Sequence, residues 1–496
     1  MRVWGGRTKW RGSCPFCETF PENIAQGIRN RYDIGTTDES VVRPVLEIPL
    51  ERRSEIPLYR QITAHLMRMI ESGTLADGTR LPGTRELASE LGISRTTATL
   101  AYDLLEDEGY LRRSGRRGTF VTSRFRLHPV SRKEAPPLID MASGLPSADL
   151  MPWEKLSTLS RLVFSRYGHA VLEGAPLPGL QALRQALVRH AATRGIPARW
   201  ENVLVTSGVQ QGLFLSFQTL ALRGVKRVWV EELTYPDALS MSENAGLSLR
   251  SVPLDVEGIL ESCRRMGQTD VLYLVPSFQN PTGRTLSHEG RKAILEVAAR
   301  RGFWIIEDDA YGELRYGEHS VPALRALESA EKVIYLGSFS QLLFPGIRQG
   351  YALVPDEILW DFCETLSRSA GAVSSLLQRL VAAFLEEGHL EPCLETARAA
   401  MSVRMRQIAQ KFGQHLPEAV FDVPQGGIYL WVTLPGAQDQ ALAELATKAG
   451  VEVACGREFS LSGRETGSVR LSISRTGSPL IAKAVGRLAD AWRDLS

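Results

Sequence analysis

The chain has 496 residues, 44% of them hydrophobic and 23% charged, and a formal net charge of +2. This length predicts about three domains, and the composition is that of a soluble globular protein with enough material for a sizeable core. The near-neutral net charge excludes a globally basic nucleic-acid-binding chain, so a basic site must be local.

The sequence predicts neither a membrane partner nor export. No apolar run is long enough to span a bilayer, and the first residues lack the apolar core of a signal peptide. Cys14 and Cys17 form a C-x-x-C, but no second pair or histidine follows at zinc spacing, so we expect no metal site. The scattered remaining cysteines fit a reducing compartment, and we expect a cytoplasmic location.

Residues 1–50 show no sustained helical or strand period, and we expect an N-terminal extension without regular structure. Order begins at "IPLYRQITAHLMRMIESG", whose apolar residues recur at helical spacing. A short helix that Thr84 could cap follows in "TRLPGTRELASELGIS". A third helix has Ser94 as its N-cap and an inward face of Ala98, Ala101, Tyr102 and Leu105. Its first turns leave four residues exposed: Arg95, Thr96, Thr97 and Thr99.

The segment "YLRRSGRRGTFVT" predicts a hairpin with a basic tip that holds Arg112, Arg113, Arg116 and Arg117. Three short helices followed by a basic hairpin predict a winged helix-turn-helix, mostly α with a small β wing. The third helix would present arginine and threonine to the major groove, and the wing would contact phosphate or the minor groove. A solvated charged hairpin on another small domain is the alternative, which the order and spacing of the elements disfavour.

This stretch resembles the DNA-binding domain of GntR-type bacterial regulators. The matching segments are "PLYRQI", "GTRLPGTRELA", "GISRTTATLAYDLLEDEGYL" and "GRRGTFV", so we place this domain at 51–122. The resemblance implies contacts to double-stranded DNA from Arg85, Ser94, Arg95, Thr96, Thr97, Arg117 and Gly118. Residues 123–137, "SRFRLHPVSRKEAPP", are a basic, proline-bearing linker that either touches phosphate or is merely solvated.

From residue 138 to 496, short apolar runs alternate with amphipathic helices, which predicts an open α/β sheet with ligand loops at its strand ends. The strand ends carry unusual chemistry. Backbone N–H groups of Gly208, Val209 and Gln210 could bind an anion at a helix N-terminus. Tyr235 either stacks on a flat ring or only packs. Asn280 lies in a proline-framed turn, Asp308 needs a cationic partner or a hydrogen bond, and three residues converge on an anion: Ser338, Ser340 and Arg348.

In this order the residues resemble the fold-type-I aminotransferases, which bind pyridoxal 5'-phosphate; "PQGGIYLWV" and "VRLSIS" extend the resemblance over about 140–492. It implies a large subdomain at about 170–350 and a small one at about 380–496. By position, Asp308 pairs with the pyridine nitrogen, Asn280 and Tyr311 serve the ring hydroxyl, and Tyr235 stacks. The phosphate is held by the amides of 208–210 with Ser338, Ser340 and Arg348, and Arg470 binds a ligand carboxylate.

A GntR-type winged helix joined to an aminotransferase-like domain resembles the MocR subfamily of regulators. In that subfamily the large domain senses a small-molecule effector through the cofactor, and the protein is usually a head-to-tail homodimer. The resemblance therefore implies a transcriptional regulator that binds an operator in double-stranded DNA.

Gln341 stands where the family pattern has the lysine that bonds the cofactor. An amide nitrogen is delocalised and does not add to an aldehyde, and it has no titratable group to move a proton. Lys332, the nearest other lysine, precedes the strand. We therefore expect no catalytic residue and no enzymatic activity.

Three alternatives remain open for the pocket of such a regulator. It binds pyridoxal phosphate, or a preformed cofactor–amine adduct, without a covalent link. It holds no cofactor and reads another anion or only supports a dimer. Or Gln341 is an engineered substitution. The rival function is a pyridoxal-phosphate-dependent aminotransferase with an appended DNA-binding module.

Overall fold

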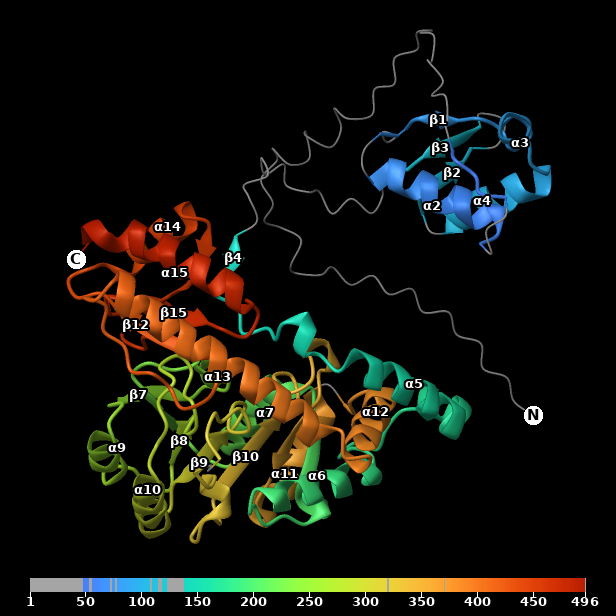
Figure 1. The fold of residues 1–496 in the computed structure, drawn as a ribbon. Helices are drawn as coiled ribbons and strands as arrows, with labels where there is room; N and C mark the ends of the chain where they lie inside the picture. Colours follow the sequence, from blue (N-terminus) through green and yellow to red (C-terminus); the bar gives the residue numbers. More distant parts are fainter. Residues whose placement is uncertain are drawn as a thin grey trace, which may run out of the picture. The chain divides into compact units, whose positions relative to one another are not determined.

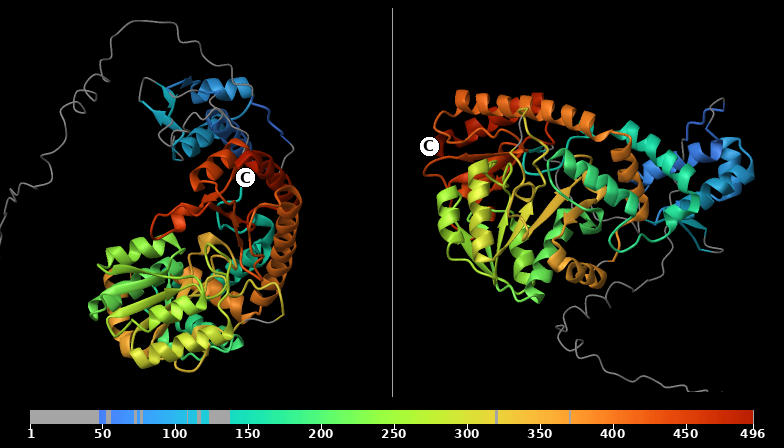
Figure 2. Two further views of the ribbon diagram at one scale, coloured as in Figure 1. Left: turned by 90° about the vertical axis from the view of Figure 1, so that its left-hand side faces the viewer. Right: turned by 90° about the horizontal axis from the view of Figure 1, so that it is seen from below.

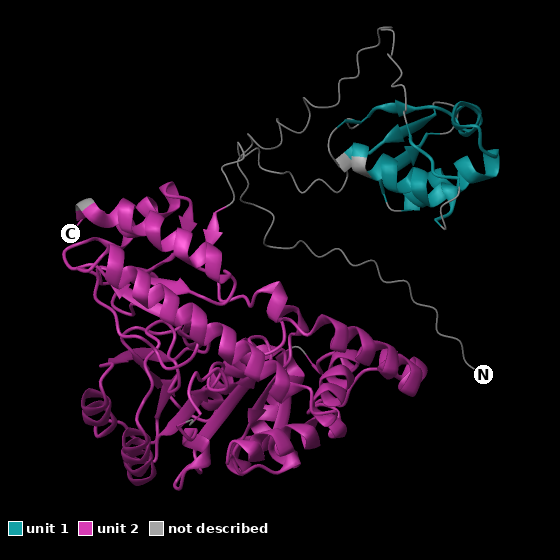
Figure 3. Cartoon of the chain, in the orientation of Figure 1, with its two compact units in different colours: residues 1–133 teal, residues 134–496 magenta. Residues whose placement is uncertain are grey.

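The computed structural model describes residues 48–52, 56–71, 74–75, 78–107, 109–114, 118–122, 138–318, 321–369 and 371–495. The chain divides into two compact units, residues 1–133 and 134–496 (Figure 3). Most of the predicted extension, the Cys14–Cys17 pair, Arg116, Arg117 and the linker 123–137 lie outside the described residues. Within the described residues, no helix has the length and hydropathy of a bilayer-spanning segment, and no cluster of three or more candidate ligands suits a metal ion.

The described residues of the first unit form three helices and a small sheet (Figure 1). The helices are α2 (Leu58–Glu71), α3 (Thr84–Leu91) and α4 (Arg95–Asp107). The strands β1 (Arg80–Leu81), β3 (Thr119–Val121) and β2 (Leu111–Arg113) pair antiparallel in the order β1-β3-β2. Helical spacing gathers the core from all three helices, and its fully buried members include Ile62, Leu66, Leu87, Ala98, Ala101, Tyr102 and Leu105.

Two helix starts in this unit test the predicted caps. Ser94 caps α4, since its Oγ accepts the backbone N–H of Thr97 at 3.0 Å. The predicted Thr84 cap is wrong: Thr84 is the first helical residue, and Gly83 is the N-cap. Gly83 has no side chain to accept a hydrogen bond, and its own N–H is satisfied by Glu86 Oε2 at 3.3 Å.

The second unit is built on a seven-stranded sheet with the order β5-β11-β10-β9-β8-β6-β7. β11 (Gly350–Leu353) runs antiparallel to both of its neighbours, and the other neighbouring pairs are parallel. The remaining strands are β5 (Val203–Thr206), β6 (Arg227–Glu231), β7 (Ser248–Val252), β8 (Asp270–Leu274), β9 (Trp304–Asp308) and β10 (Val333–Ser338).

Helices cover both faces of this sheet (Figure 2). Because side chains alternate along a strand, Leu272 and Ile305 join the core under α9 (Val256–Cys263) and α10 (His288–Arg301). Tyr273 and Ile306 face the opposite core. Helices that contribute to that core are α5 (Trp153–Tyr167), α6 (Gln181–Thr193), α7 (Gly208–Leu222), α8 (Pro236–Asn244), α11 (Leu359–Ser369) and α12 (Ser375–Glu386).

A smaller lobe follows the long helix α13 (Leu390–His415). Its sheet has the order β12-β15-β14, from β12 (Tyr429–Thr433), β15 (Ser468–Ser472) and β14 (Ala454–Cys455). Helices α14 (Asp439–Lys448) and α15 (Ser478–Trp492) complete it. The start of the unit joins this lobe, because β4 (Ile139–Asp140) pairs parallel with β13 (Val451–Glu452). α12, which spans the predicted start of the small subdomain at about residue 380, packs on α5 and α6 instead of on this lobe.

The topology brings several strand ends to one edge. Since β8, β9 and β10 are parallel, Asn280 after β8, Asp308 at the end of β9 and Ser338 at the end of β10 lie at the same edge of the sheet. β5 is antiparallel to β11, as β10 is, so the start of α7 reaches this edge too.

Candidate functional site

One cavity of about 310 Å³ at this edge gathers the predicted pocket residues. Its lining contains Gly208, Val209, Gln210, Tyr235, Asn280, Asp308, Tyr311, Ser338, Ser340, Gln341, Arg348 and Arg470. The structure adds Gly144, Leu145, Val275, Ala310, Pro345 and Tyr429. Their assembly in one cavity is a structural observation, whereas their contacts with a ligand remain predictions.

The start of α7 and Arg348 lie together in the part of the cavity that we predict to bind an anion. α7 begins at Gly208, so the N–H groups of its first turn have no partner within the helix. Arg348 Nη2 donates to the carbonyl oxygen of Ser207 at 3.0 Å, which holds the guanidinium beside that turn. Ser338 Oγ accepts the N–H of Ser340 at 3.1 Å. Arg348 contacts the neutral carbonyl of Ser207 and forms no ion pair with a described carboxylate, so its charge is available to an anion.

Two features of the backbone hold this part of the cavity in shape. Arg348 has a φ of 44°, a left-handed conformation that costs a non-glycine residue free energy and is often retained at functional sites. A Cβ on Gly350 would lie 2.9 Å from the Cα of Gly208 and from the carbonyl oxygen of Gly337. Only glycine therefore lets β11 approach the start of α7 so closely, a constraint that sequence reasoning missed.

Asp308 provides a buried carboxyl to the lining of the cavity. It is 4% exposed, and its Oδ2 accepts the hydroxyl of Tyr273 at 2.9 Å. Burial is the main cause that raises the pKa of Asp308 to about 7. A protonated ring nitrogen beside it would hold it as a carboxylate. The sequence analysis did not identify Tyr273. In the β8–β9 register Tyr273 lies opposite Ile306, and because side chains alternate along a strand, it shares a face of the sheet with Asp308.

The raised pKa of Asp308 predicts a pH effect on stability. The folded chain keeps a proton on Asp308 between about pH 4 and 7 that the unfolded chain releases, so the free energy of unfolding falls as the pH rises through this window. Asp308→Asn removes that titration. We expect the free energy of unfolding of the variant, minus that of the native chain, to increase from pH 4 to 7 in urea denaturation.

Asp422→Asn is the matched control, because the Asp422 side chain is 84% exposed. A difference for Asp308→Asn that stays constant with pH, or that changes no more than the control, would contradict the prediction.

Tyr235 is held by two polar neighbours. Its hydroxyl donates to Asp237 Oδ2 at 2.5 Å and accepts from Gln210 Nε2 at 3.0 Å. Burial, reinforced by Asp237, raises the pKa of Tyr235 above its usual value, so the hydroxyl stays protonated. The side chain of Gln210 therefore orients the aromatic ring, which leaves only its backbone N–H for an anion.

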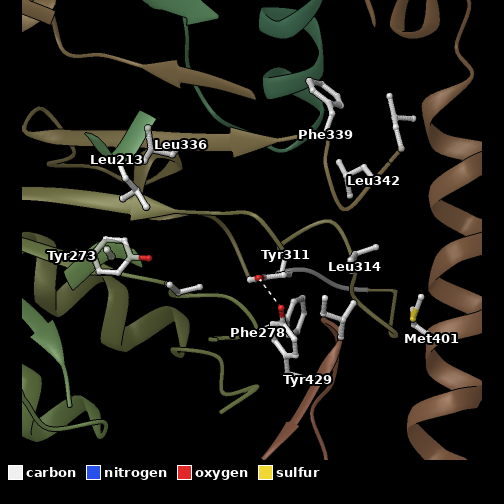
Figure 4. Packing of buried hydrophobic residues seen from close by; sticks show 14 of the residues in the cluster. Leu213, Tyr273, Phe278, Tyr311, Leu314, Leu336, Phe339, Leu342, Met401 and Tyr429 are labelled. Atoms are coloured by element: carbon white, nitrogen blue, oxygen red, sulfur yellow. Dashed lines mark hydrogen bonds between the residues drawn. The ribbon is translucent and has the colours of Figure 1, made fainter. Parts of the chain in front are cut away.

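Tyr311 and Tyr429 both line the cavity and lie beside each other, with hydroxyl oxygens 3.5 Å apart (Figure 4). Phe278 lies beside them and has a φ of 53°. A Cβ on Gly426 would lie 2.3 Å from the ring of Phe278, so glycine at 426 lets this ring pack against the loop before β12. The contact joins the turn that carries Asn280 to the small lobe.

Arg470 is a buried cation without a charged partner. It is 9% exposed, and it donates to Asn280 Oδ1 at 2.8 Å and to the carbonyl oxygen of Ala142 at 2.7 Å. Its guanidinium carbon lies 4.0 Å from the centre of the Tyr429 ring. Its Nε has no acceptor, and no carboxylate pairs with it among the described residues. A buried cation of this kind favours an anionic ligand, as a ligand carboxylate would be.

Gln341 lines the cavity, and its Oε1 is buried without a hydrogen-bond donor among the described residues. Lys332 does not replace the missing amine. It precedes β10, whereas the cavity lies at the other end of that strand, about 20 Å away. Lys332 Nζ donates to the carbonyl oxygen of Gly302 at 3.1 Å and lies 5.1 Å from the Trp304 ring.

A larger cavity of about 810 Å³, lined by parts of α6, α12 and α13, contains none of the predicted residues. Asp309, the neighbour of Asp308, points away from the ligand pocket into an ion-pair network near this cavity. It pairs with Arg194 and accepts the hydroxyl of Tyr335 at 2.8 Å. The two adjacent aspartates therefore differ in environment, and only Asp308 lines the pocket.

The first unit exposes most of the residues predicted to contact DNA. Arg85 on α3 and Ser94, Arg95 and Thr96 at the start of α4 are exposed, and Thr97 is half-buried. Gly118 has a φ of 111°, and a Cβ there would lie 2.9 Å from Arg80 Nε. Arg80, which sequence reasoning missed, therefore lies beside the wing.

The predicted wing tip needs a correction. Arg112 and Arg113 lie on β2, not at the tip. Arg113 pairs with Asp103 at 2.5 Å and with Glu106 at 3.4 Å, both on α4, so its charge is largely neutralised within the unit. Arg116 and Arg117 lie outside the described residues.

Comparison with known proteins supports both units. Residues 136–488 match the aminotransferase class I and II family, and residues 58–121 match the bacterial regulatory proteins of the gntR family. The chain is 30% identical over 454 residues to the probable rhizopine catabolism regulatory protein MocR of Rhizobium meliloti, across 85% of this chain and 91% of that protein. The chain belongs to the MocR subfamily of GntR-type transcriptional regulators.

Other relatives agree with membership of the MocR subfamily. The regulator TauR of Rhodobacter capsulatus is 31% identical over 464 residues, across 86% of this chain and 94% of that protein. Among solved structures, the α-aminoadipate aminotransferase LysN of Thermus thermophilus has a TM-score of 0.67 at 30% identity, across 72% of this chain and 92% of that chain. That structure contains N-(5'-phosphopyridoxyl)-L-leucine.

These matches confirm the predicted fold class and the predicted function of this MocR-type chain as a DNA-binding transcriptional regulator. The relatives include both regulators and an aminotransferase, so membership of the subfamily alone does not exclude catalysis. Position 341 bears on catalysis, because Gln341 stands where the family pattern has a lysine.

Proposed function

We propose that this regulator controls transcription through a pocket that binds a pyridoxal-phosphate-related ligand without a covalent bond. The observation that carries the proposal is the single cavity that combines the α7 start and Arg348, Asp308 and Arg470 with an amide at position 341. These groups complement a phosphate, a pyridine nitrogen and a carboxylate, respectively. Pyridoxal phosphate, when bound, would supply an aldehyde to which amines add.

We propose that the aminotransferase-like domain is catalytically inactive. Gln341 cannot form the bond to the cofactor or carry the proton that transamination needs. Lys332 is engaged with Gly302 and Trp304. Transamination of common amino acids by the purified chain, lost in Arg470→Ala, would overturn this part and support the enzyme alternative.

Exposed apolar side chains of the second unit support a homodimer, which we propose to be head-to-tail. Trp153 is 75% exposed and Phe164 48% exposed on α5, and Leu172 just beyond that helix is 81% exposed. Large exposed apolar groups on one segment are typical of protein interfaces. A full-length chain that sediments as a monomer at micromolar concentration would overturn this assignment. As a regulator of bacterial operators in double-stranded DNA, the protein would act in the cytoplasm.

Calorimetry of the full-length chain with pyridoxal phosphate tests the pocket. We expect saturable binding that Arg348→Ala weakens by at least about tenfold, because the variant removes a charge-assisted hydrogen bond to phosphate. Arg406→Ala is the control, since Arg406 is exposed on α13 and absent from the cavity lining. Equal loss in both variants, or unchanged binding in Arg348→Ala, would contradict the assignment of Arg348.

A further inference from the structure

Gln341 brings an unsatisfied hydrogen-bond acceptor to the pocket. Its Oε1 is buried and accepts no hydrogen bond within the described residues, although the residue lines the cavity. An unpaired buried carbonyl costs free energy that a ligand with a donor would recover. At this point of the pocket, therefore, a ligand that carries an N–H would satisfy Gln341 Oε1, whereas one that carries only an acceptor leaves this oxygen unpaired.

Arg470 sets a second requirement on the same ligand. Its two Nη atoms donate to neutral acceptors, Asn280 Oδ1 and the carbonyl oxygen of Ala142, and these do not neutralise its charge. Its buried Nε has no acceptor within the part of the chain that the structure describes. The ligand that best satisfies Arg470 is therefore a carboxylate, which can accept charge-assisted hydrogen bonds.

The chemical forms of the cofactor differ in these two features. Pyridoxal phosphate carries an aldehyde, which offers only an acceptor to Gln341 Oε1. Pyridoxamine phosphate carries N–H donors but no carboxylate. An amino acid joined to the cofactor through its nitrogen, with loss of water, carries both a carboxylate and, when that nitrogen is protonated, an N–H.

We propose that the pocket selects the cofactor already joined to an amino acid over pyridoxal phosphate itself, with Gln341 Oε1 as the acceptor for the linking N–H and Arg470 as the partner of the carboxylate. This inference rests on the proposed function, which orients the ring between Asp308 and the start of α7. Gln341 then recognises a bond that has formed elsewhere, and the regulator responds to the pool of condensed cofactor rather than forming it.

Calorimetry on the full-length chain with three probes tests the selection. The probes are pyridoxal phosphate, pyridoxamine phosphate and N-(5'-phosphopyridoxyl)-L-leucine, whose reduced linkage keeps its N–H. We expect the leucine adduct to bind at least about tenfold tighter than pyridoxal phosphate, with pyridoxamine phosphate between them, as one additional hydrogen bond to a buried group allows.

Two substitutions at position 341 separate the acceptor from side-chain size. Gln341→Met has similar length and no amide acceptor, and we expect it to weaken the leucine adduct and pyridoxamine phosphate about tenfold more than it weakens pyridoxal phosphate. Gln341→Glu keeps an acceptor and should keep the preference. Arg470→Lys should weaken the leucine adduct more than pyridoxamine phosphate. Thermal unfolding of each variant verifies that it folds.

The outcomes distinguish the selection from the pocket itself. If pyridoxal phosphate binds as tightly as the adduct, or if Gln341→Met weakens all three probes equally, the selection is overturned while the cofactor pocket stands. If none of the three probes binds the native chain, the proposed function fails with it.

Discussion

Gln341→Lys should convert the pocket into a covalent cofactor site. A lysine amine in this cavity, which Arg348 also lines, is shifted toward its neutral form by that positive charge and adds to the aldehyde of pyridoxal phosphate with loss of water. Borohydride reduction followed by mass spectrometry of the denatured chain should show one cofactor bound per variant chain and none on the native chain. The expected effect is all-or-none, since an amide nitrogen does not form this bond.

Gln341→Met controls for the mere loss of the amide, and it should stay unlabelled. Peptide mapping must place the label at position 341, because a label at Lys332 would show that this lysine reaches the pocket after all. If Gln341→Lys remains unlabelled although it is folded, position 341 does not face the cofactor aldehyde. The likeness to aminotransferases would then be one of architecture only.

Arg95→Ala should relax the sequence preference of DNA binding. Arg95 is exposed at the first residue of α4, where the end of a recognition helix meets base edges in the major groove. If its guanidinium binds one guanine through two hydrogen bonds, the variant should lose about 1–3 kcal/mol of discrimination at one base position. Binding-site selection from a random duplex pool, before and after the substitution, measures this loss.

Arg112→Ala on β2 is the comparison for Arg95→Ala. Arg112 is exposed on the wing, and we expect it to contribute to DNA affinity without sequence preference. Its removal should therefore weaken binding to all sequences and reduce the salt dependence of binding. If Arg95→Ala also weakened binding equally for all sequences, Arg95 would be a phosphate contact. Its assignment to base recognition would then be wrong.

Both predictions rely on patterns that are local in the sequence. The buried face of α4 follows from the helical spacing of Ala98, Ala101, Tyr102 and Leu105, all of which are fully buried. The pocket residues follow strands that are parallel neighbours in the sheet, and parallel strands share one carboxyl edge. The pattern of strands in the sequence therefore predicts that the pocket residues lie at one edge of the sheet.

Other features could not be predicted, because they depend on register or on contacts distant in the sequence. Tyr273 sits in an apolar strand where an aromatic residue predicts only packing, and its bond to Asp308 depends on the β8–β9 register. Arg113 forms ion pairs with Asp103 and Glu106 on α4, because the hairpin folds back on that helix. Its charge is therefore not presented at the wing tip. Neither partner is marked in the local sequence.

The sequence by itself determined the two-part organisation of this regulator, the identity of most of its pocket residues and the absence of an amine at position 341. These are matters of residue type and of local periodicity, which the chain carries without folding. Only the tertiary structure decided that Arg470 meets Asn280 across 190 residues, that Gly350 lies against Gly208, and that no described residue donates a hydrogen bond to Gln341 Oε1. Burial and hydrogen-bond satisfaction depend on every neighbour at once, so they exist only in the folded chain.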